Sequence, residues 1–147
     1  MLKREKIDIS METTMQNVKC KEVSAEYLKS IGYHFENGTL ERAEVTDING
    51  VATVNAVIKL SSGGYCSLGG YGCGQYNPQY KSIKGSRFGF ESLLWLMAIA
   101  GVSSSAELGG QFVRVALDSS DRASFIGHIV EDRWFCFATL CKELGKE

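Results

Sequence analysis

The sequence has few of the residues that usually build a metal centre or a catalytic pair. It contains only two histidines, His34 and His128, and its five cysteines include no Cys-x-x-Cys spacing. We therefore expect no structural zinc site, no other bound metal and no cofactor. An odd number of cysteines without paired spacing is typical of free thiols in a reducing compartment.

Neither sign of charge is in excess, because 16 Lys and Arg residues oppose 17 Asp and Glu residues. A chain of net charge −1 has no overall field that attracts nucleic acid, which argues against a nucleic-acid partner. The most hydrophobic stretch, 88–102, contains Glu91 and is shorter than the roughly 20 residues that span a bilayer. The start, 1–8, lacks the apolar run of a signal peptide. We expect a cytoplasmic protein without a membrane partner.

The length of 147 residues and the hydrophobic content of 44% fit one ordinary core. We therefore predict a single domain over 1–147. Its parts would be an N-terminal extension with a short helix (1–38), a sheet-plus-helix core (39–135) and a C-terminal tail (136–147).

The predicted fold is α+β: an antiparallel β-meander sheet packed on one main apolar helix, with a short N-terminal helix. Asn49-Gly50, a strong hairpin signal, separates the expected strands 40–48 and 51–60. Further strands are expected at 65–71, 111–117 and 124–130, and a short one at 6–11. Short helices are expected at 24–31, capped by Ser24, and at 137–144.

The segment 72–85 contains the only proline, Pro78, and we expect it to be a long loop of functional importance. The main helix follows, from Phe88 or Phe90 to Ala100, and Gly101 ends it. It is apolar nearly all round, with Phe90, Leu93, Leu94, Met97 and Ala98 in one stripe. Such a helix is either sandwiched in a core or buried in an oligomer interface.

The glycine-rich run 69–74 is followed by Lys84, Ser86 and Arg87 just before the main helix. An anion at that position would meet free backbone amides, a hydroxyl and up to two cations. Two interpretations stay open for each feature. The glycines are either a phosphate nest or a strand edge against which another segment packs closely, and Ser86 with its neighbours is either an anion site or an ordinary helix cap.

Four residues of the C-terminal half are further candidates. Arg114 lies inside a strand, which suggests a paired carboxylate or a bound anion. His128 is either a satisfied sheet histidine or a ligand contact, and Trp134, beside Arg133, is either a core anchor or a stacking ring. The cysteines fit core or surface thiols better than a nucleophile, because no spacing places one beside a histidine. We predict no catalytic residues.

Several motifs together resemble a family of small phage and prophage proteins. They are the glycine-rich strand 63–71, the helix start 85–94, the segments 100–102 and 107–115, and the segment 126–135. Within that group the sequence resembles Thoeris anti-defence proteins of the signal-sponge kind. The resemblance covers most of the predicted core but not the residues before Gly38.

The resemblance implies a protein that binds a cyclic ADP-ribose isomer or a cyclic oligonucleotide and sequesters it without cleavage. It also implies a homodimer or a higher homo-oligomer. The adenine would stack on an aromatic ring, and the pyrophosphate would meet arginines and helix amides. The residues expected to bind the ligand are Tyr71, Lys84, Ser86, Arg87, Phe88, Phe90, Arg114, His128, Arg133 and Trp134.

Three other functions stay open. The chain could be an inhibitor or an adaptor that binds a host protein through Tyr76, Tyr80 and Trp95. It could bind single-stranded nucleic acid, with Lys59, Lys81 and Lys84 along the phosphates. A nucleotide hydrolase is disfavoured, because no carboxylate pair or Cys/His pair stands at a meaningful spacing.

Overall fold

The computed structural model describes residues 18–48 and 50–145. The strand predicted at 6–11 lies outside these residues. The described chain begins with the 3-10 helix η1 (Cys20–Glu22) and the helix α2 (Ala25–Ser30). The backbone N–H of Tyr27 donates to the hydroxyl of Ser24, so the predicted cap of α2 is confirmed.

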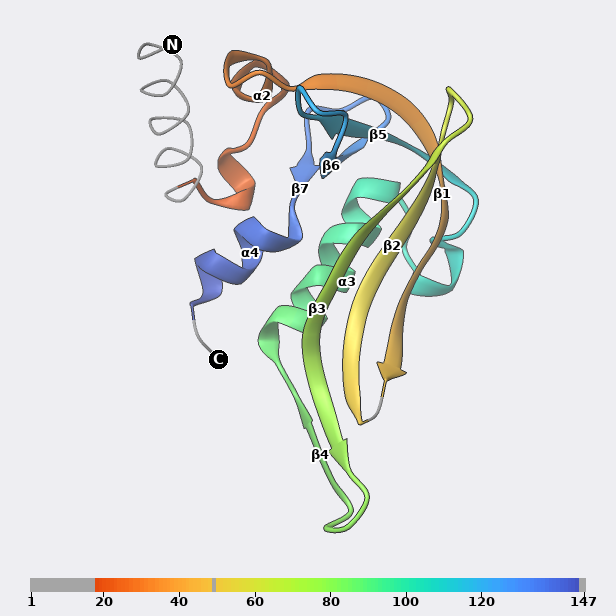
Figure 1. Ribbon diagram of the computed structural model, residues 1–147, viewed down its shortest axis with the longest axis vertical. Helices are drawn as coiled ribbons and strands as arrows, with labels where there is room; N and C mark the ends of the chain where they lie inside the picture. Colours follow the sequence, from red (N-terminus) through yellow and green to blue (C-terminus); the bar gives the residue numbers. More distant parts are fainter. Residues whose placement is uncertain (1–17, 49, 146–147) are drawn as a thin grey trace.

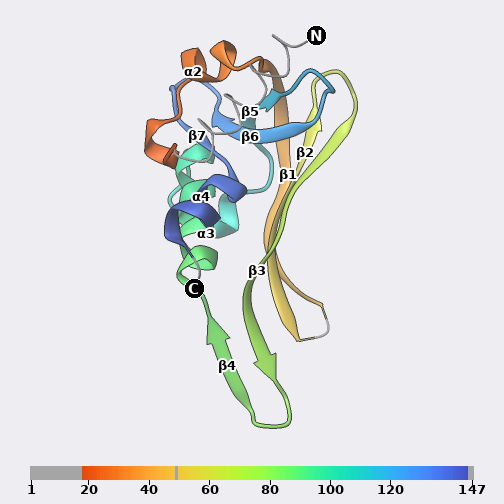
Figure 2. The ribbon, with the colours of Figure 1, turned by 60° about the vertical axis from the view of Figure 1, so that its left-hand side comes forward.

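Seven antiparallel strands form one sheet that curls into a half-barrel around helix α3 (Figures 1 and 2). The strand order is β4-β3-β2-β1-β5-β6-β7. The strands are β1 (His34–Ile48), β2 (Val51–Leu60), β3 (Tyr65–Asn77), β4 (Ser82–Gly85), β5 (Gln111–Leu117), β6 (Ala123–His128) and β7 (Trp134–Phe135). The predicted α+β class and the meander of the first three strands are confirmed.

Strand β1 is longer than predicted, because it begins at His34 and not at Leu40. Its first half pairs with β5, from His34 opposite Leu117 to Leu40 opposite Gln111. Its second half pairs with β2. One long strand therefore joins the meander of the first strands to the strands that follow α3.

The loop predicted over 72–85 is wrong. Residues 72–77 belong to β3 and residues 82–85 form β4, so only 78–81 make a turn. At this turn the carboxamide oxygen of Asn77 accepts hydrogen bonds from the backbone N–H groups of Gln79 and Tyr80. The β3–β4 hairpin extends beyond the rest of the molecule (Figures 1 and 2).

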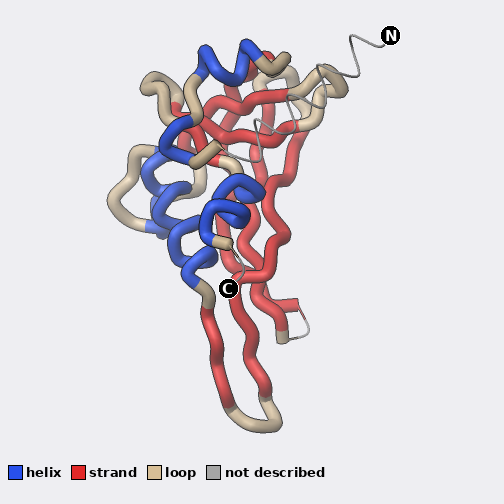
Figure 3. Tube along the Cα trace, turned by 90° about the vertical axis from the view of Figure 1, so that its left-hand side faces the viewer, coloured by secondary structure: helices blue, strands red, loops and turns tan. Residues whose placement is uncertain are grey.

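Helix α3 (Arg87–Ala100) packs one side on the sheet and ends at Gly101, whose φ of 72° fits the predicted cap. Its buried residues are Phe88, Gly89, Ser92, Leu96 and Ile99. The expected apolar stripe is thus mostly on other sides of the helix, and Phe90 and Leu94 are 67% and 46% exposed. Figure 3 shows α3 and α4 together on one side of the sheet, with α2 apart from them at one end of the molecule.

The C-terminal part completes two apolar clusters. Helix α4 (Phe137–Leu144) was predicted with these bounds and packs beside α3. Trp134 and Phe125 belong to a second cluster, to which Leu28 of α2 and Val23 before this helix also belong. A short 3-10 helix, η2 (Ser105–Glu107), precedes β5. None of the helices within 18–48 and 50–145 has the length and hydropathy that a bilayer crossing requires.

Candidate ligand-binding site

Ser86 fixes the junction between the β3–β4 hairpin and helix α3. Its hydroxyl accepts a hydrogen bond from the N–H of Gly89 at 3.2 Å and donates one to the carbonyl of Cys73 at 3.2 Å. Its own N–H also donates to that carbonyl, at 3.0 Å. The start of α3 is therefore held against β3, and Ser86 is the N-cap of this helix, which was one of the two interpretations that the sequence left open.

Two glycines allow the close approach at this junction. A Cβ atom at Gly89 would lie 2.5 Å from Cβ of Cys73, and one at Gly74 would lie 2.8 Å from the carbonyl oxygen of Lys84. Both distances are too short for real atoms, so the contacts need glycine. Part of the glycine-rich run thus forms a strand against which other segments pack.

Two grooves border the base of the hairpin. The first, here called the polar groove, has a volume of about 420 Å³. It is lined by Val51, Gly72, Cys73, Gly74, Gln75, Lys84, Gly85, Ser86 and Arg87. The second, here called the apolar groove, has a volume of about 500 Å³. It shares with the first groove Cys73, Gly74, Gln75, Lys84, Gly85 and Ser86. Its other lining residues are Val45, Asp47, Ala52, Tyr76, Ile83, Gly89, Phe90 and Leu93.

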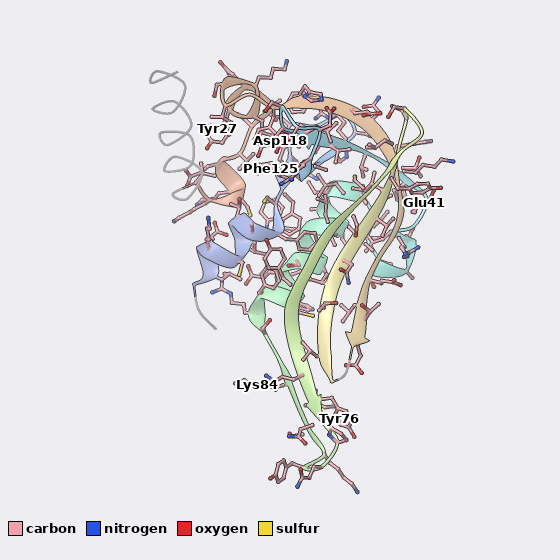
Figure 4. All side chains as sticks on the ribbon, in the orientation of Figure 1. Tyr27, Glu41, Tyr76, Lys84, Asp118 and Phe125 are labelled. Atoms are coloured by element: carbon pink, nitrogen blue, oxygen red, sulfur yellow. The ribbon has the colours of Figure 1, made fainter. Side chains whose placement is uncertain are left out.

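The pairing of β3 with β4 separates two kinds of side chain. Gln75 stands opposite Lys84, and Tyr76 stands opposite Ile83. Because successive side chains of a strand point to opposite faces, the first pair lies on one face of the hairpin and the second pair on the other. Figure 4 shows Lys84 and Tyr76 on the projecting hairpin. A cationic face and an aromatic face therefore lie back to back.

The charge at the junction is positive. The segment 72–90 contains no Asp or Glu, whereas Lys81, Lys84 and Arg87 lie within it. Arg87 forms an ion pair with Glu91 one helical turn later, although its side chain is 64% exposed. The positive end of the α3 dipole adds to this field. The polar groove can therefore attract an anion.

Tyr71 and Phe88 contact each other, but only Phe88 is buried, because Tyr71 is 38% exposed. Phe88 is 6% exposed, and its ring meets that of Tyr71 edge-on with centroids 5.8 Å apart. Tyr71 also stacks on Phe137 at 6.3 Å and borders a separate hollow of about 310 Å³. Neither residue lines either groove.

Arg114 and His128 make hydrogen bonds that hold the turn between β6 and β7. Arg114 donates to the backbone carbonyls of His128 and Glu131, both at 2.8 Å, and its guanidinium lies 4.8 Å from the centroid of a Trp134 ring. The sequence suggested a paired carboxylate or a bound anion for Arg114, but its partners in the structure are backbone carbonyl oxygens. Nδ1 of His128 accepts from the N–H groups of Val130 and Glu131. Both side chains thus have structural partners in this turn.

Arg133 and Trp134 belong to a third depression, here called the helix cleft. It has a volume of about 490 Å³ and lies between η1, α3 and residues 132–134. Its lining residues are Cys20, Lys21, Val23, Glu91, Leu94, Trp95, Ala98, Asp132, Arg133 and Trp134. Arg133 donates to the carbonyl of Ala98 at 2.8 Å and pairs with Glu131. Trp134 is 1% exposed and donates to Asp132 at 2.9 Å, so it is a core anchor.

The predicted residues therefore fall into separate places. Lys84, Ser86, Arg87 and Phe90 meet at the hairpin, whereas Arg133 contacts the other end of α3. The 11 residues from Arg87 to Ala98 correspond to about 17 Å along a helix. One small ligand does not reach both ends.

Three of the five cysteines have thiols that burial makes less reactive. Burial raises the pKa of the Cys20 thiol from 9.0 to about 12. Burial also raises the pKa of the thiols of Cys66 and Cys73. Within the described ranges, no three His, Cys, Asp or Glu side chains are grouped to hold a metal ion.

Comparisons with protein-family models, with curated proteins and with solved structures find no match for this chain. The resemblance to phage proteins therefore stays a prediction.

Sequence reasoning missed Gln75, Ile83 and the β1 side of the apolar groove. Val45 and Ala52 reach the groove only because β1, β2 and β3 pair side by side. The alternation in Ser82-Ile83-Lys84 was a usable strand signal, which the nearby proline and glycines obscured.

Proposed function

We propose that this protein is a phage anti-defence protein that binds a nucleotide immune signal and holds it without cleaving it. The signal would be a cyclic ADP-ribose isomer or a cyclic oligonucleotide, and the protein would act as a homo-oligomer. The biological role rests on the sequence resemblance. The binding site rests on one observation: the polar groove, which two cations line, and the apolar groove, which Tyr76 and Phe90 line, share the base of one hairpin.

Lys84 and Arg87 are suited to the phosphates, because both line the polar groove and no acid lines it. Arg87 pairs with Glu91 but stays 64% exposed. The base would lie in the apolar groove against Tyr76, which is 46% exposed, with Ile83 beside it. Phe90 borders the same groove. The two grooves meet at Gly85 and Ser86, which line both of them.

Binding alone accounts for this arrangement. A sponge competes with a receptor and needs nanomolar affinity, about −12 kcal/mol. Neither groove holds a histidine or a pair of carboxylates suited to acid–base chemistry. We therefore propose no reaction.

The test is thermal unfolding of the protein with a panel of cyclic ADP-ribose isomers, cyclic dinucleotides and cyclic trinucleotides. One ligand should raise Tm by several degrees and be recovered intact after heating. Lys84→Ala should weaken its affinity by about tenfold or more, the loss of a charge-assisted hydrogen bond. The matched control is Lys81→Ala, which removes the same charge from the same hairpin outside both grooves. No shift with any ligand, or equal losses in both variants, would contradict the proposal.

A second candidate function is inhibition of a host protein through the hairpin. Tyr80 and Ile83, on the projecting hairpin, are 72% and 82% exposed. Trp95, which was also expected to serve this surface, is partly buried and stacks on Phe135 at 5.9 Å. This function predicts a stable complex with one host protein and no retained nucleotide.

A further inference from the structure

Strand β4 is an edge of the sheet. Among the described residues it has a partner strand on one side only, because it stands at the end of the strand order. Figures 1 and 2 show it on the hairpin that projects from the molecule. Ile83, inside this strand, is 82% exposed. An unpaired edge with an exposed apolar side chain is a place where another extended chain can add.

The hydrogen bonds between β3 and β4 follow a fixed alternation. The N–H of Ser86 donates to the carbonyl of Cys73 at 3.0 Å, which makes these residues a hydrogen-bonded pair. In an antiparallel ladder such pairs alternate with pairs that exchange no hydrogen bond. Gln75 and Lys84 are therefore the next bonded pair, and the backbone groups of Lys84 are used inside the hairpin.

The residues between the bonded ones have backbone groups that point outward. Tyr76 shows this directly, because its N–H donates to the carbonyl of Gly50 at 2.9 Å, on the β2 side of β3. Ile83 stands opposite Tyr76, so its N–H and C=O point to the outer side of β4. Gly85, two residues further, has the same direction. Donors and acceptors for a further strand therefore lie along the open edge.

The face of β4 that carries Ile83 has room for a side chain of an added strand. Gly85 lies on the same face, because residues two apart in a strand share a face. A Cβ atom at Gly85 would meet no atom within 4 Å. Phe90 borders the same groove and is 67% exposed. An apolar side chain placed beside Gly85 therefore has open space and an aromatic ring nearby.

The opposite face of β4 is cationic. Lys84 lies on it, Lys81 directly precedes β4, and the segment 72–90 contains no Asp or Glu. Acidic side chains of an added strand are favoured on this face, because opposite charges on neighbouring strands attract. A second copy of this chain does not suit the edge, since two paired β4 strands would bring lysines together.

We propose that β4 binds an extended segment of a host protein in which apolar residues alternate with acidic ones. The segment adds to the sheet as a further strand, with hydrogen bonds to the backbone of Ile83 and Gly85. Its apolar side chains lie on the face of Ile83, and its acidic side chains lie near Lys84. The inference rests on the second candidate function, binding of a host protein, and names the chemistry of that partner.

The probe is a synthetic peptide in which Val and Glu alternate, with both ends capped. Its binding to the full-length chain is followed by amide hydrogen exchange in NMR spectra. The N–H groups of Ile83 and Gly85 should exchange fast in the free protein. At a saturating concentration the peptide should slow both by about tenfold or more, because a bonded N–H exchanges only after the added strand is released.

Two changes test the backbone hydrogen bonds themselves. A peptide methylated on the backbone nitrogens of one edge keeps every side chain but loses donors, and it should bind about tenfold more weakly. Ile83→Pro makes the complementary change in the protein, because it removes an outward N–H and no hydrogen bond of the β3–β4 ladder. Ile83→Val is its matched control and should bind the peptide like wild type. The methylated peptide gives the same test if Ile83→Pro does not fold.

Lys81→Glu tests the charge, because Lys81 lies outside both grooves proposed for the nucleotide. It should weaken binding of the Val and Glu peptide by about threefold or more at low salt. It should leave nucleotide affinity unchanged. A peptide with Lys in place of Glu should bind the wild-type chain more weakly than the acidic peptide.

Equal binding of the methylated and unmethylated peptides would overturn the inference, as would unchanged exchange at Ile83 and Gly85. A host-protein complex that Ile83→Pro leaves intact would overturn it and leave the second candidate function standing. A nucleotide that raises Tm, together with no binding of the acidic peptide, would overturn the inference and leave the nucleotide function standing.

Discussion

The indole of Trp134 lies against the backbone of Gly127 on the neighbouring strand. A Cβ atom at Gly127 would be 2.5 Å from both Cε3 and Cζ3 of the ring. The two residues stand opposite each other in the β6–β7 ladder. The second apolar cluster therefore depends on a glycine at this position.

Gly127→Ala should lower the free energy of unfolding by about 1–3 kcal/mol, because the ring must move out of its packed position. Gly64→Ala is the control, since a Cβ atom there would meet nothing within 4 Å. Denaturant unfolding of the two variants measures the difference. Equal stability of both variants would show that the ring is not tightly held.

Arg114→Met should lower stability by about 2 kcal/mol and leave nucleotide affinity unchanged. The substitution keeps the apolar stem over Trp134 but removes the donors to the carbonyls of His128 and Glu131. Arg42→Met is the control, because Arg42 pairs only with the exposed Glu44. A loss of ligand affinity in Arg114→Met without a loss of stability would instead assign Arg114 to the ligand.

The carboxylate of Glu36 should contribute to stability only where it is ionised. Hydrogen bonds from Ser62 hold the pKa of Glu36 below its usual 4.5, the N–H donating at 2.8 Å. Since folding lowers this pKa, the ionised carboxylate stabilises the folded protein at neutral pH. This contribution to the free energy of unfolding is lost as the pH falls below 4.5 and passes the pKa that Glu36 has in the folded state. The stability difference between wild type and Glu36→Gln should shrink in that range.

An NMR titration of the Glu36 carboxyl carbon checks the same point. Its midpoint should lie below 4.5, and Ser62→Ala should raise it, because the hydroxyl is the largest cause of the shift. A wild-type midpoint at or above 4.5 would refute this account.

Cys20 should resist alkylation in the folded protein. It is 2% exposed, and burial raises the pKa of its thiol to about 12, so very little thiolate exists at pH 8. Iodoacetamide treatment followed by peptide mass spectrometry should label Cys20 only in denaturant. Fast labelling of Cys20 under native conditions would point to a reactive thiol that the structure does not explain.

The hairpin at 72–85 illustrates what the sequence could not predict. Its residues carry the turn and glycine signals of a loop, but pairing with β2 recruits 72–75 into β3, and β4 then adds to β3. The same pairing separates Lys84 from Ile83 onto opposite faces. Likewise, the sequence grouped Arg114, His128 and Arg133 with Arg87, while the length of α3 keeps Arg133 away from the hairpin.

The sequence by itself determined the local elements: the cap at Ser24, the change from β1 to β2 between Ile48 and Val51, the helix end at Gly101 and the bounds of 111–117 and 137–144. These depend on neighbouring residues, through capping, turn conformation and hydrophobic periodicity. Only the tertiary structure decided that β5 pairs with β1 and which side of α3 is buried. Those outcomes depend on contacts between residues far apart in the chain, because burial is shared among all the packed elements at once.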